Sequence, residues 1–205
     1  MSKSSRSTAH ARVAVPDKHE AILRAAITVF AEKGYFNSKV ADIASEAGVA
    51  DGTVYLYFKS KEEILHSIFN RAMEKFIDEG TKELSNIKDV TKRLARIAEL
   101  HLERLGGDRD LAVVFQVELR GSTKFMEAFS AAGFAKYLDI IKRTVEEGQK
   151  SGDFRADIKA ITIAKMFYGV LDEMVTDWIL SKKAYQLAPM AKEVMKLFLG
   201  GISHK

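Results

Sequence analysis

The chain has 205 residues, of which 47% are hydrophobic, and it carries a formal net charge of +4. This length and apolar content are sufficient for one large or two modest domains that fold without covalent staples. The absence of cysteine excludes disulfides, thiolate metal sites and cysteine nucleophiles, and it fits a reducing compartment. No apolar run reaches the roughly 18 residues that span a bilayer, and the polar start has no hydrophobic signal region, so we expect a soluble cytoplasmic protein without a membrane partner.

Residues 1–15 form a polar segment with three basic side chains, Lys3, Arg6 and Arg12, and no acidic one. This composition predicts a disordered basic arm, and a minor-groove or phosphate contact is the sharper alternative. The remaining positive charge is spread along the chain. Charge alone is therefore compatible with a nucleic-acid partner without establishing one.

Apolar residues recur three to four positions apart through most of the chain, and the only prolines are Pro16 and Pro189. This spacing predicts an all-α protein of about nine helices. The first helix should begin near Asp17, which follows Pro16 and forms a capping-box-like pair with Glu20, and it should end at Gly34.

Residues 38–58 read SKVADIASEAGVADGTVYLYF. Their apolar pattern predicts a short helix that ends at Gly48, followed by a second short helix through Val54 and Tyr55. This is the pattern of a helix-turn-helix, in which the first helix braces against the DNA backbone and the second lies in the major groove. We therefore predict a DNA-binding domain over residues 16–60.

The outward residues of the second short helix should be small or hydrogen-bonding, whereas Val54 and Phe58 should face inward. Gly52 leaves room for a phosphate at the helix start, and Thr53 offers a hydroxyl. Two tyrosines and the lysines around the start of the next helix can reach phosphate oxygens, where the helix dipole assists. The predicted DNA-binding residues are Lys39, Asp51, Gly52, Thr53, Tyr55, Tyr57, Lys59 and Lys61.

From Gly34 to Leu65 the sequence GYFNSKVADIASEAGVADGTVYLYFKSKEEIL resembles the DNA-binding domain of the TetR family of bacterial regulators. The match includes the glycine–aromatic corner, the D-I-A and A-G-V stretches, G-T-x-Y-x-Y-F and K-S-K-E. Ala50 departs from the family, which usually has Ser or Thr as the helix cap there, and so does Tyr57, where the family often has His. The resemblance implies a homodimeric repressor that binds a palindromic operator.

Ser60 and Glu63 form a capping box that should open a fourth helix, which runs towards Gly80 and joins the DNA-binding domain to the rest. Five further helices are predicted over residues 89–105, 109–119, 123–150, 157–180 and 189–199. We expect residues 61–205 to form an effector-binding and dimerisation domain.

The last two predicted helices carry more apolar surface than one core face requires. A second copy of the chain is the economical cover, because two such helices from each subunit form a four-helix bundle and a dimer presents two reading helices to DNA. In the TetR resemblance these helices supply the dimer interface. The alternative is that they are ordinary core helices of a monomer.

No catalytic constellation is present. The five histidines are scattered, and neither a G-x-S-x-G elbow nor a phosphate-binding loop occurs. Glu63 and His66 form one E-x-x-H, half of a di-iron motif, but the other half is missing. We expect no enzyme, no metal site and no cofactor, and we interpret His101 as a solvated or hydrogen-bonded helix residue rather than a ligand contact.

Aromatic residues gather between residues 109 and 180, beside Gly133 and Gly169, where a well-packed helix would prefer alanine. Large rings beside glycines predict a ligand cavity, and a plain aromatic core is the alternative. The candidate lining residues are Phe115, Gln116, Phe125, Phe134, Tyr137, Met166 and Phe167. The aromatic cluster also contains Phe129 and Tyr168, and polar groups on the same helices, Asp172 among them, could orient a ligand or face water.

The segments LGGDRDLAVVFQVELRGS, EGQKSGDFRADI and GVLDEMVTDWILSKKAYQL are similar to the acyl-CoA-responsive repressors of fatty-acid degradation within the TetR family. The resemblance implies that a long-chain acyl-CoA enters the cavity and releases the protein from its operator. Arg120, then Arg104 and Arg109, are candidates for the CoA phosphates, because a guanidinium matches phosphate geometry. Two alternatives stay open: a TetR-type repressor of drug efflux that senses an unrelated hydrophobic compound, and, more remotely, an enzyme or carrier acting on acyl-CoA.

Overall fold

The computed structural model describes residues 17–129 and 133–203, so the basic arm predicted over residues 1–15 lies outside the described residues. Within the described ranges every named element is a helix, as the periodicity predicts, apart from one isolated bridge between Phe154 and Ser203. No helix in these ranges is long and apolar enough to cross a membrane.

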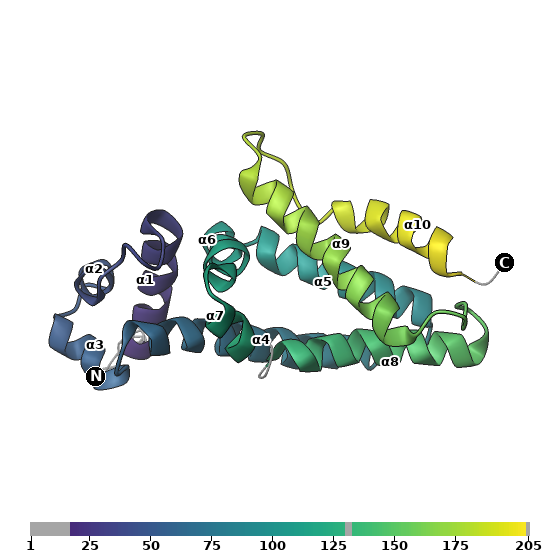
Figure 1. Cartoon of the computed structure of the whole chain (residues 1–205), viewed down its shortest axis with the longest axis horizontal. Coiled ribbons are helices and arrows are strands. Elements are labelled where there is room, and N and C mark those ends of the chain that lie inside the picture. Colours follow the sequence, from purple (N-terminus) through teal and green to yellow (C-terminus); the bar gives the residue numbers. More distant parts are fainter. Residues whose placement is uncertain (1–16, 130–132, 204–205) are drawn as a thin grey trace, which may run out of the picture.

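Three helices form a separate head at one end of the molecule (Figure 1). The first begins after Asp17, whose side chain accepts a hydrogen bond from the His19 N–H at 3.1 Å, and it ends at Gly34, where φ is 78°. Its buried residues include Ile22, Ala26 and Phe30, and the helix packs against the second helix, which in turn packs against the third. The helices are α1 (Lys18–Lys33), α2 (Val40–Glu46) and α3 (Asp51–Tyr57).

The fourth helix, α4 (Lys61–Leu84), leads from the head along one side of the larger domain (Figure 1). One half of the predicted capping box at its start is present, since Ser60 Oγ accepts from the Glu63 N–H at 3.1 Å. Glu63 itself accepts from the N–H of Lys59, the residue before the cap, at 2.6 Å rather than from that of Ser60. The helix continues past Gly80, where the sequence predicts its end. A lone glycine costs a helix only about 1 kcal/mol relative to alanine, which is too little to end a helix whose buried face packs on α5.

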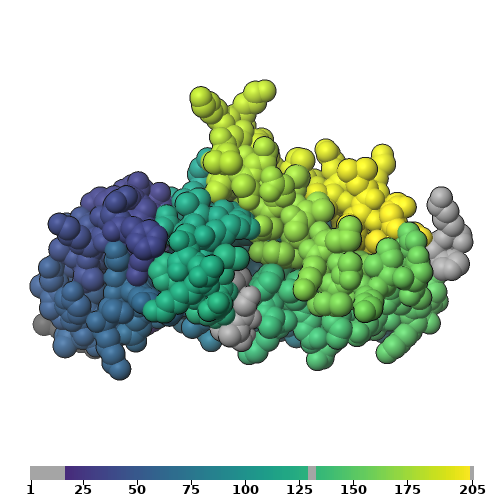
Figure 2. Space-filling view, viewed as in Figure 1, coloured from purple at the N-terminus to yellow at the C-terminus, as the bar shows by residue number. Residues whose placement is uncertain are grey.

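The larger domain surrounds α5, which packs against α4, α6, α8, α9 and α10. In Figure 2 the segment from α6 to α7 lies between the head and α9, and it makes the visible surface continuous. The elements are α5 (Val90–Gly106), α6 (Arg109–Val113), a π-helical turn (Val114–Glu118), a 3-10 turn (Leu119–Gly121), α7 (Thr123–Phe129), α8 (Ala135–Ser151), α9 (Ala160–Leu180) and α10 (Met190–Ile202).

Two further predicted helices differ from the structure. The helix predicted over residues 109–119 is α6 followed by the π-helical turn, so its last turn is widened. The helix predicted over residues 123–150 is two helices, α7 and α8, and residues 130–132 between them are outside the described ranges. The described residues therefore contain ten α-helices rather than nine.

The two glycines that suggested a cavity have different surroundings. A Cβ at Gly133 would lie 2.5 Å from the Cβ of Met73, so this glycine permits a close approach to α4 rather than leaving space. A Cβ at Gly169 would meet nothing within 4 Å. The open volume of the domain is thus not located at Gly133.

Candidate functional site

The head has the geometry of a helix-turn-helix. Gly48, with φ of 66°, ends α2, and α3 starts at Asp51. Ala50 gives α3 no side-chain cap, as its apolar side chain predicts. Val54 and Phe58 are buried, at 0% and 3% exposure, so the inward face of α3 is as predicted.

The opposite face of α3 is open to solvent. Tyr55 is 56% exposed and Tyr57 is 41% exposed, whereas Thr53 is half-buried. The contacts of these residues with DNA remain predictions. Of the eight candidates, the structure places six on the exposed surface: Lys39, Asp51, Gly52, Tyr55, Tyr57 and Lys59.

Leu56 lies between the two exposed tyrosines and is itself 82% exposed. The expectation that outward residues of this helix are small or hydrogen-bonding does not hold here. An apolar side chain in the major groove can contact only one base feature well, the C5-methyl group of thymine. Its position between Tyr55 and Tyr57 is the signal that sequence reasoning missed.

Lys61 has a different environment from Lys59. Its ammonium donates to the backbone carbonyls of Tyr35 at 2.5 Å and Ser38 at 2.7 Å, and it lies 4.3 Å from the centre of the Tyr35 ring. Burial lowers its pKa. Two of its three donors hold the corner between α1 and α2, so Lys61 has a structural task beside any contact with phosphate.

The corner that Lys61 holds is also tied to the larger domain. The Tyr35 N–H donates to Glu118 Oε2 at 2.9 Å, and Glu118 is only 8% exposed. A second link joins α1 to the start of α6, where Arg24 pairs with Asp108 and, at 3.0 Å, with Asp110. Both links come from residues 108–121, which form α6, the π-helical turn and the 3-10 turn. We call this stretch the α6 segment.

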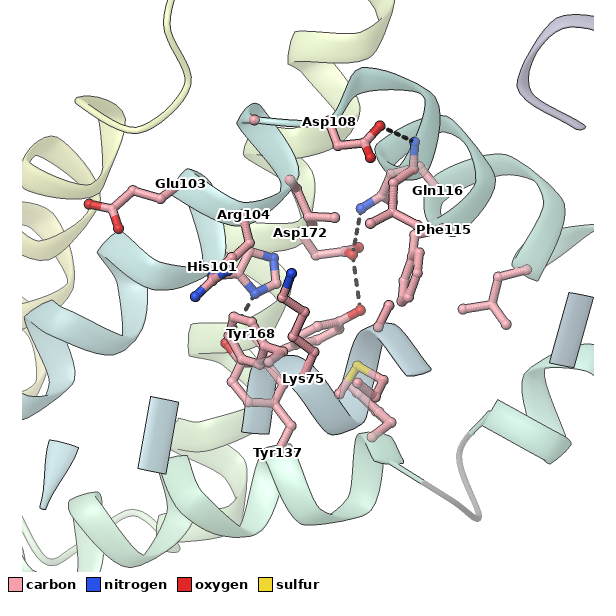
Figure 3. Close-up of a pocket in the computed structure, with 18 of the residues that line it drawn as sticks. Lys75, His101, Glu103, Arg104, Asp108, Phe115, Gln116, Tyr137, Tyr168 and Asp172 are labelled. Carbon is pink, nitrogen blue, oxygen red and sulfur yellow. Dashed lines mark hydrogen bonds between the residues drawn. The ribbon is translucent and has the colours of Figure 1, made fainter. Parts of the chain in front are cut away.

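The other face of this segment lines a cavity of about 510 Å³ (Figure 3). This volume lies within the usual range for small-molecule sites, roughly 300–1,000 Å³. The walls come from α4, α5, α6 with the turns that follow it, α7, α8 and α9. The lining residues are Ala72, Met73, Lys75, Phe76, His101, Glu103, Arg104, Leu105, Gly107, Asp108, Leu111, Phe115, Gln116, Leu119, Arg120, Met126, Phe134, Tyr137, Tyr168 and Asp172.

Six of the ten candidate ligand-binding residues line this cavity: Arg104, Phe115, Gln116, Arg120, Phe134 and Tyr137. The other four, Arg109, Phe125, Met166 and Phe167, do not.

Each of those four has other surroundings. The Arg109 guanidinium lies 5.0 Å from the Trp178 ring centre and donates to the Ile179 carbonyl at 2.6 Å. Phe125 packs against Tyr35 and the head, with ring centres 5.0 Å apart.

On α9 the cavity face carries Tyr168 and Asp172, which are one helical turn apart. Tyr168 belongs to the predicted aromatic cluster, whereas Met166 and Phe167, the two ligand-binding candidates from this helix, are rotated away from that face. Phe167 is buried against Phe198 of α10, and Met166 is 60% exposed.

A polar network occupies the α9 wall. Asp172 accepts hydrogen bonds from Gln116 Nε2 at 2.9 Å and from the Tyr168 hydroxyl at 3.0 Å, and it pairs with Arg120. Figure 3 shows Gln116 and Tyr168 converging on the Asp172 carboxylate. Because Asp172 neutralises Arg120, this guanidinium is less available to a ligand phosphate than its position in the sequence suggests.

His101, on α5, lies beside the Tyr168 end of this network, with the centres of the two rings 5.9 Å apart. It is 6% exposed, and its Nδ1 is 3.0 Å from the Tyr137 hydroxyl. Desolvation lowers its pKa to about 4, so the ring is neutral at pH 7. The expectation of a hydrogen bond holds, but His101 is buried rather than solvated, and it lines the cavity.

Charged side chains gather where the cavity opens. Lys75 is exposed on α4, at helical spacing from Ala72, and no ion pair or hydrogen bond is found for it among the described residues. Arg104 pairs with Glu79. Sequence reasoning missed Lys75, whose signal is the run Ala72, Lys75 and Phe76 on one helix face.

In residues 17–129 and 133–203, no three His, Cys, Asp or Glu side chains are grouped so that they could hold a metal ion. A DNA-reading head joined through α4 and the α6 segment to a ligand-sized cavity defines a one-component transcriptional regulator. Two family models match the chain: bacterial regulatory proteins of the tetR family over residues 22–68, and the C-terminal region of YsiA-like proteins over residues 69–201. The chain belongs to the TetR family.

Several relatives that are named as regulators of fatty-acid metabolism or degradation match nearly the whole chain. The fatty acid metabolism regulator protein of Bacillus subtilis is 37% identical over 92% of this chain and 97% of its own length. The structure of FadR from Bacillus subtilis in complex with stearoyl-CoA has a TM-score of 0.85 and 36% identity, covering 90% of this chain and 99% of that one. The fatty acid degradation regulator FadR from Bacillus halodurans has a TM-score of 0.86 and 35% identity over 93% and 99%.

Proposed function

We propose that this protein is a homodimeric repressor that leaves its operator when a long-chain acyl-CoA fills the cavity, and that it thereby controls genes of fatty-acid metabolism. The observation that carries the proposal is the cavity of about 510 Å³, with apolar walls and cationic side chains at its opening, directly behind the helix-turn-helix. The similarity to a protein whose structure contains stearoyl-CoA supports the choice of effector.

The walls suit a hydrocarbon chain. Met73, Phe76, Leu111 and Phe115 contribute apolar surface from three sides. Burying each methylene contributes about 0.8 kcal/mol, so affinity should rise with chain length until the cavity is filled.

The opening suits the phosphates of CoA. Lys75 and Arg104 both line it, and among the described residues Arg104 pairs with Glu79 whereas no carboxylate partner is found for Lys75. Lys75 therefore precedes Arg120 as the expected phosphate contact, because the charge of Arg120 is already compensated by Asp172.

Dimerisation would cover the exposed apolar side chains of α9 and α10. Met166, Val170 and Leu180 on α9 and Leu197 on α10 are between 39% and 82% exposed. A twofold contact through these helices buries the same patch on both subunits and places two reading helices on one DNA duplex. Replacing Leu197 by Glu should then shift the protein towards monomer in analytical ultracentrifugation.

Release follows from linkage between the two sites. An effector that binds more tightly to the conformation with misplaced heads must weaken operator binding by the same factor. The cavity wall and the contacts to the head share the α6 segment and α4, so the ligand can bias the position of the head. Because the relatives are regulators, we assign residues 61–205 to effector binding and dimerisation rather than to catalysis.

The experiment is an operator-release titration. A fluorescent operator, selected from genomic DNA by footprinting, is bound to the purified protein and titrated with stearoyl-CoA, hexanoyl-CoA and free CoA. We expect release at the lowest concentration with stearoyl-CoA and none with free CoA. A complex that survives saturating stearoyl-CoA would overturn the choice of effector and favour an unrelated hydrophobic compound, which mass spectrometry of co-purifying molecules would identify.

A further inference from the structure

His101 presents a polar atom for which the described part of the chain offers no partner. Its Nδ1 is bound to the Tyr137 hydroxyl, and its Nε2 is buried without a hydrogen bond. In an imidazole ring the two nitrogens point in nearly opposite directions, so Nε2 points away from Tyr137. Figure 3 shows this second nitrogen turned towards the side of the cavity that holds Asp172.

The partner of Nδ1 determines the tautomer. Burial raises the pKa of Tyr137, so its hydroxyl keeps its proton and needs an acceptor. Among the described residues the only hydrogen-bond partner of this hydroxyl is His101 Nδ1. The hydroxyl therefore donates to Nδ1, and the ring proton sits on Nε2.

A buried N–H without an acceptor is unfavourable, and native proteins contain few of them. Because His101 lines the cavity, a ligand can supply the missing acceptor. The ring is neutral, and Asp172 acts on it electrostatically, so the pocket suits an uncharged oxygen better than a carboxylate.

The position of His101 indicates which ligand atom this is. It lies on α5 one turn before Arg104 at the cavity opening, and Phe76 packs beside it from α4 with ring centres 6.3 Å apart. The contact point is thus the boundary between the apolar walls and the charged opening. In an acyl-CoA, the group at the boundary between chain and head is the thioester.

We propose that His101 Nε2–H donates a hydrogen bond to the thioester carbonyl oxygen of the effector and thereby selects activated acyl chains. This inference rests on the proposed acyl-CoA function. Tyr137 is the positioning residue, because its hydroxyl sets the tautomer that makes Nε2 a donor.

The test removes the two partners of the proposed hydrogen bond separately, the His101 donor in the protein and the carbonyl acceptor in the ligand. Wild type, His101→Phe and His101→Gln are titrated by calorimetry with stearoyl-CoA and with S-octadecyl-CoA, a thioether in which a methylene replaces the carbonyl. We expect wild type to bind the thioester about tenfold more tightly than the thioether, in keeping with one buried hydrogen bond. His101→Phe should bind both ligands equally, and His101→Gln, which keeps a side-chain N–H, should restore part of the preference.

Equal binding of the two ligands by wild type, or an undiminished preference in His101→Phe, would overturn the carbonyl contact while leaving the acyl-CoA function intact. If neither ligand binds wild type, the proposed function fails and the carbonyl contact fails with it. Folding of each variant is checked by circular dichroism. Should His101→Phe not fold, Tyr137→Phe tests the same contact, because it removes the tautomer control and should reduce the preference.

Discussion

Glu118 accepts a hydrogen bond from the backbone N–H of Tyr35 at 2.9 Å, across 83 positions of sequence. Glu118 belongs to the π-helical turn, whose neighbouring residues Gln116, Leu119 and Arg120 line the cavity. Tyr35 belongs to the corner that Lys61 holds at the base of the helix-turn-helix. A widened helical turn can change its register with little loss of hydrogen bonding, and such turns occur frequently at functional sites. We therefore expect this contact to transmit cavity occupancy to the head.

Replacing Glu118 by Ala should reduce the coupling between effector and operator. The variant leaves the Tyr35 N–H buried without an acceptor, which costs about 1–3 kcal/mol of stability. The measured quantity is the ratio of operator dissociation constants with and without stearoyl-CoA, which should fall towards one. Glu127→Ala is the matched control, because Glu127 is exposed on α7. A Glu118→Ala protein with the wild-type ratio would contradict this route.

Lys59 and Lys61 should differ when each is replaced by Ala, although both flank the start of α4. Lys59 is exposed, so its loss should weaken operator binding and lower the salt slope by about one, without a change in melting temperature. Lys61 donates hydrogen bonds to the backbone carbonyls of Tyr35 and Ser38, so its loss should also lower the melting temperature of the protein.

Thermal melts and salt titrations of the two variants measure this difference side by side. Two variants with equal melting temperatures would show that the Lys61 contacts contribute nothing to the head. If neither substitution weakens operator binding, the assignment of these lysines to phosphate contacts is wrong.

Leu56 should read a thymine in the operator. Its exposed side chain projects from the reading helix, and the thymine methyl is the apolar feature of the major groove. Replacing single thymines of the operator by deoxyuridine removes only that methyl group. At one position we expect weaker binding by wild type but no further loss with Leu56→Ala. Operators in which every such replacement is silent would remove Leu56 from base recognition.

Local signals account for the parts of the fold that the sequence predicts well. The Ser60 cap of α4, the end of α1 at Gly34 and the inward face of Val54 and Phe58 each depend on residues within one or two helical turns. The helix-turn-helix was therefore predictable at residue level. The link between the π-helical turn and the head was not, because the hydrogen bond between Glu118 and Tyr35 joins two segments that are distant in the sequence.

The cavity was predictable as a region but not as a set of contacts. Which face of α9 meets the cavity depends on how α9 packs on α8, so Tyr168 and Asp172 line it in place of Met166 and Phe167. Arg120 has the expected location, but Asp172 is 52 positions away in the sequence, and only the fold brings the two together. Such long-range pairs carry no periodic signal.

His101 should make the protein less stable as the pH falls from about 6.5 to about 4. Desolvation lowers its pKa to about 4 in the folded state, from 6.5 for an exposed histidine. Between these values the unfolded chain binds a proton that the native protein does not, so the free energy of unfolding decreases on acidification and reaches a deficit of about 3 kcal/mol near pH 4. Above pH 6.5 the residue contributes no pH dependence. The other titratable groups that line the same cavity are Lys75, Glu103, Arg104, Asp108, Arg120, Tyr137, Tyr168 and Asp172.

Urea denaturation of wild type and His101→Phe between pH 7.5 and 4.5 isolates this contribution. Carboxylates with lowered pKa values, such as Asp42 beside Lys33 and Glu62 beside Lys124, also cost stability on acidification, but mainly below their unfolded pKa values near 4. They are unchanged in the variant, so they cancel in the difference between the two profiles. That difference should widen steadily below pH 6.5. Parallel profiles would show that His101 is solvated in the native protein, and a solvated ring would have no unpaired donor to offer a ligand.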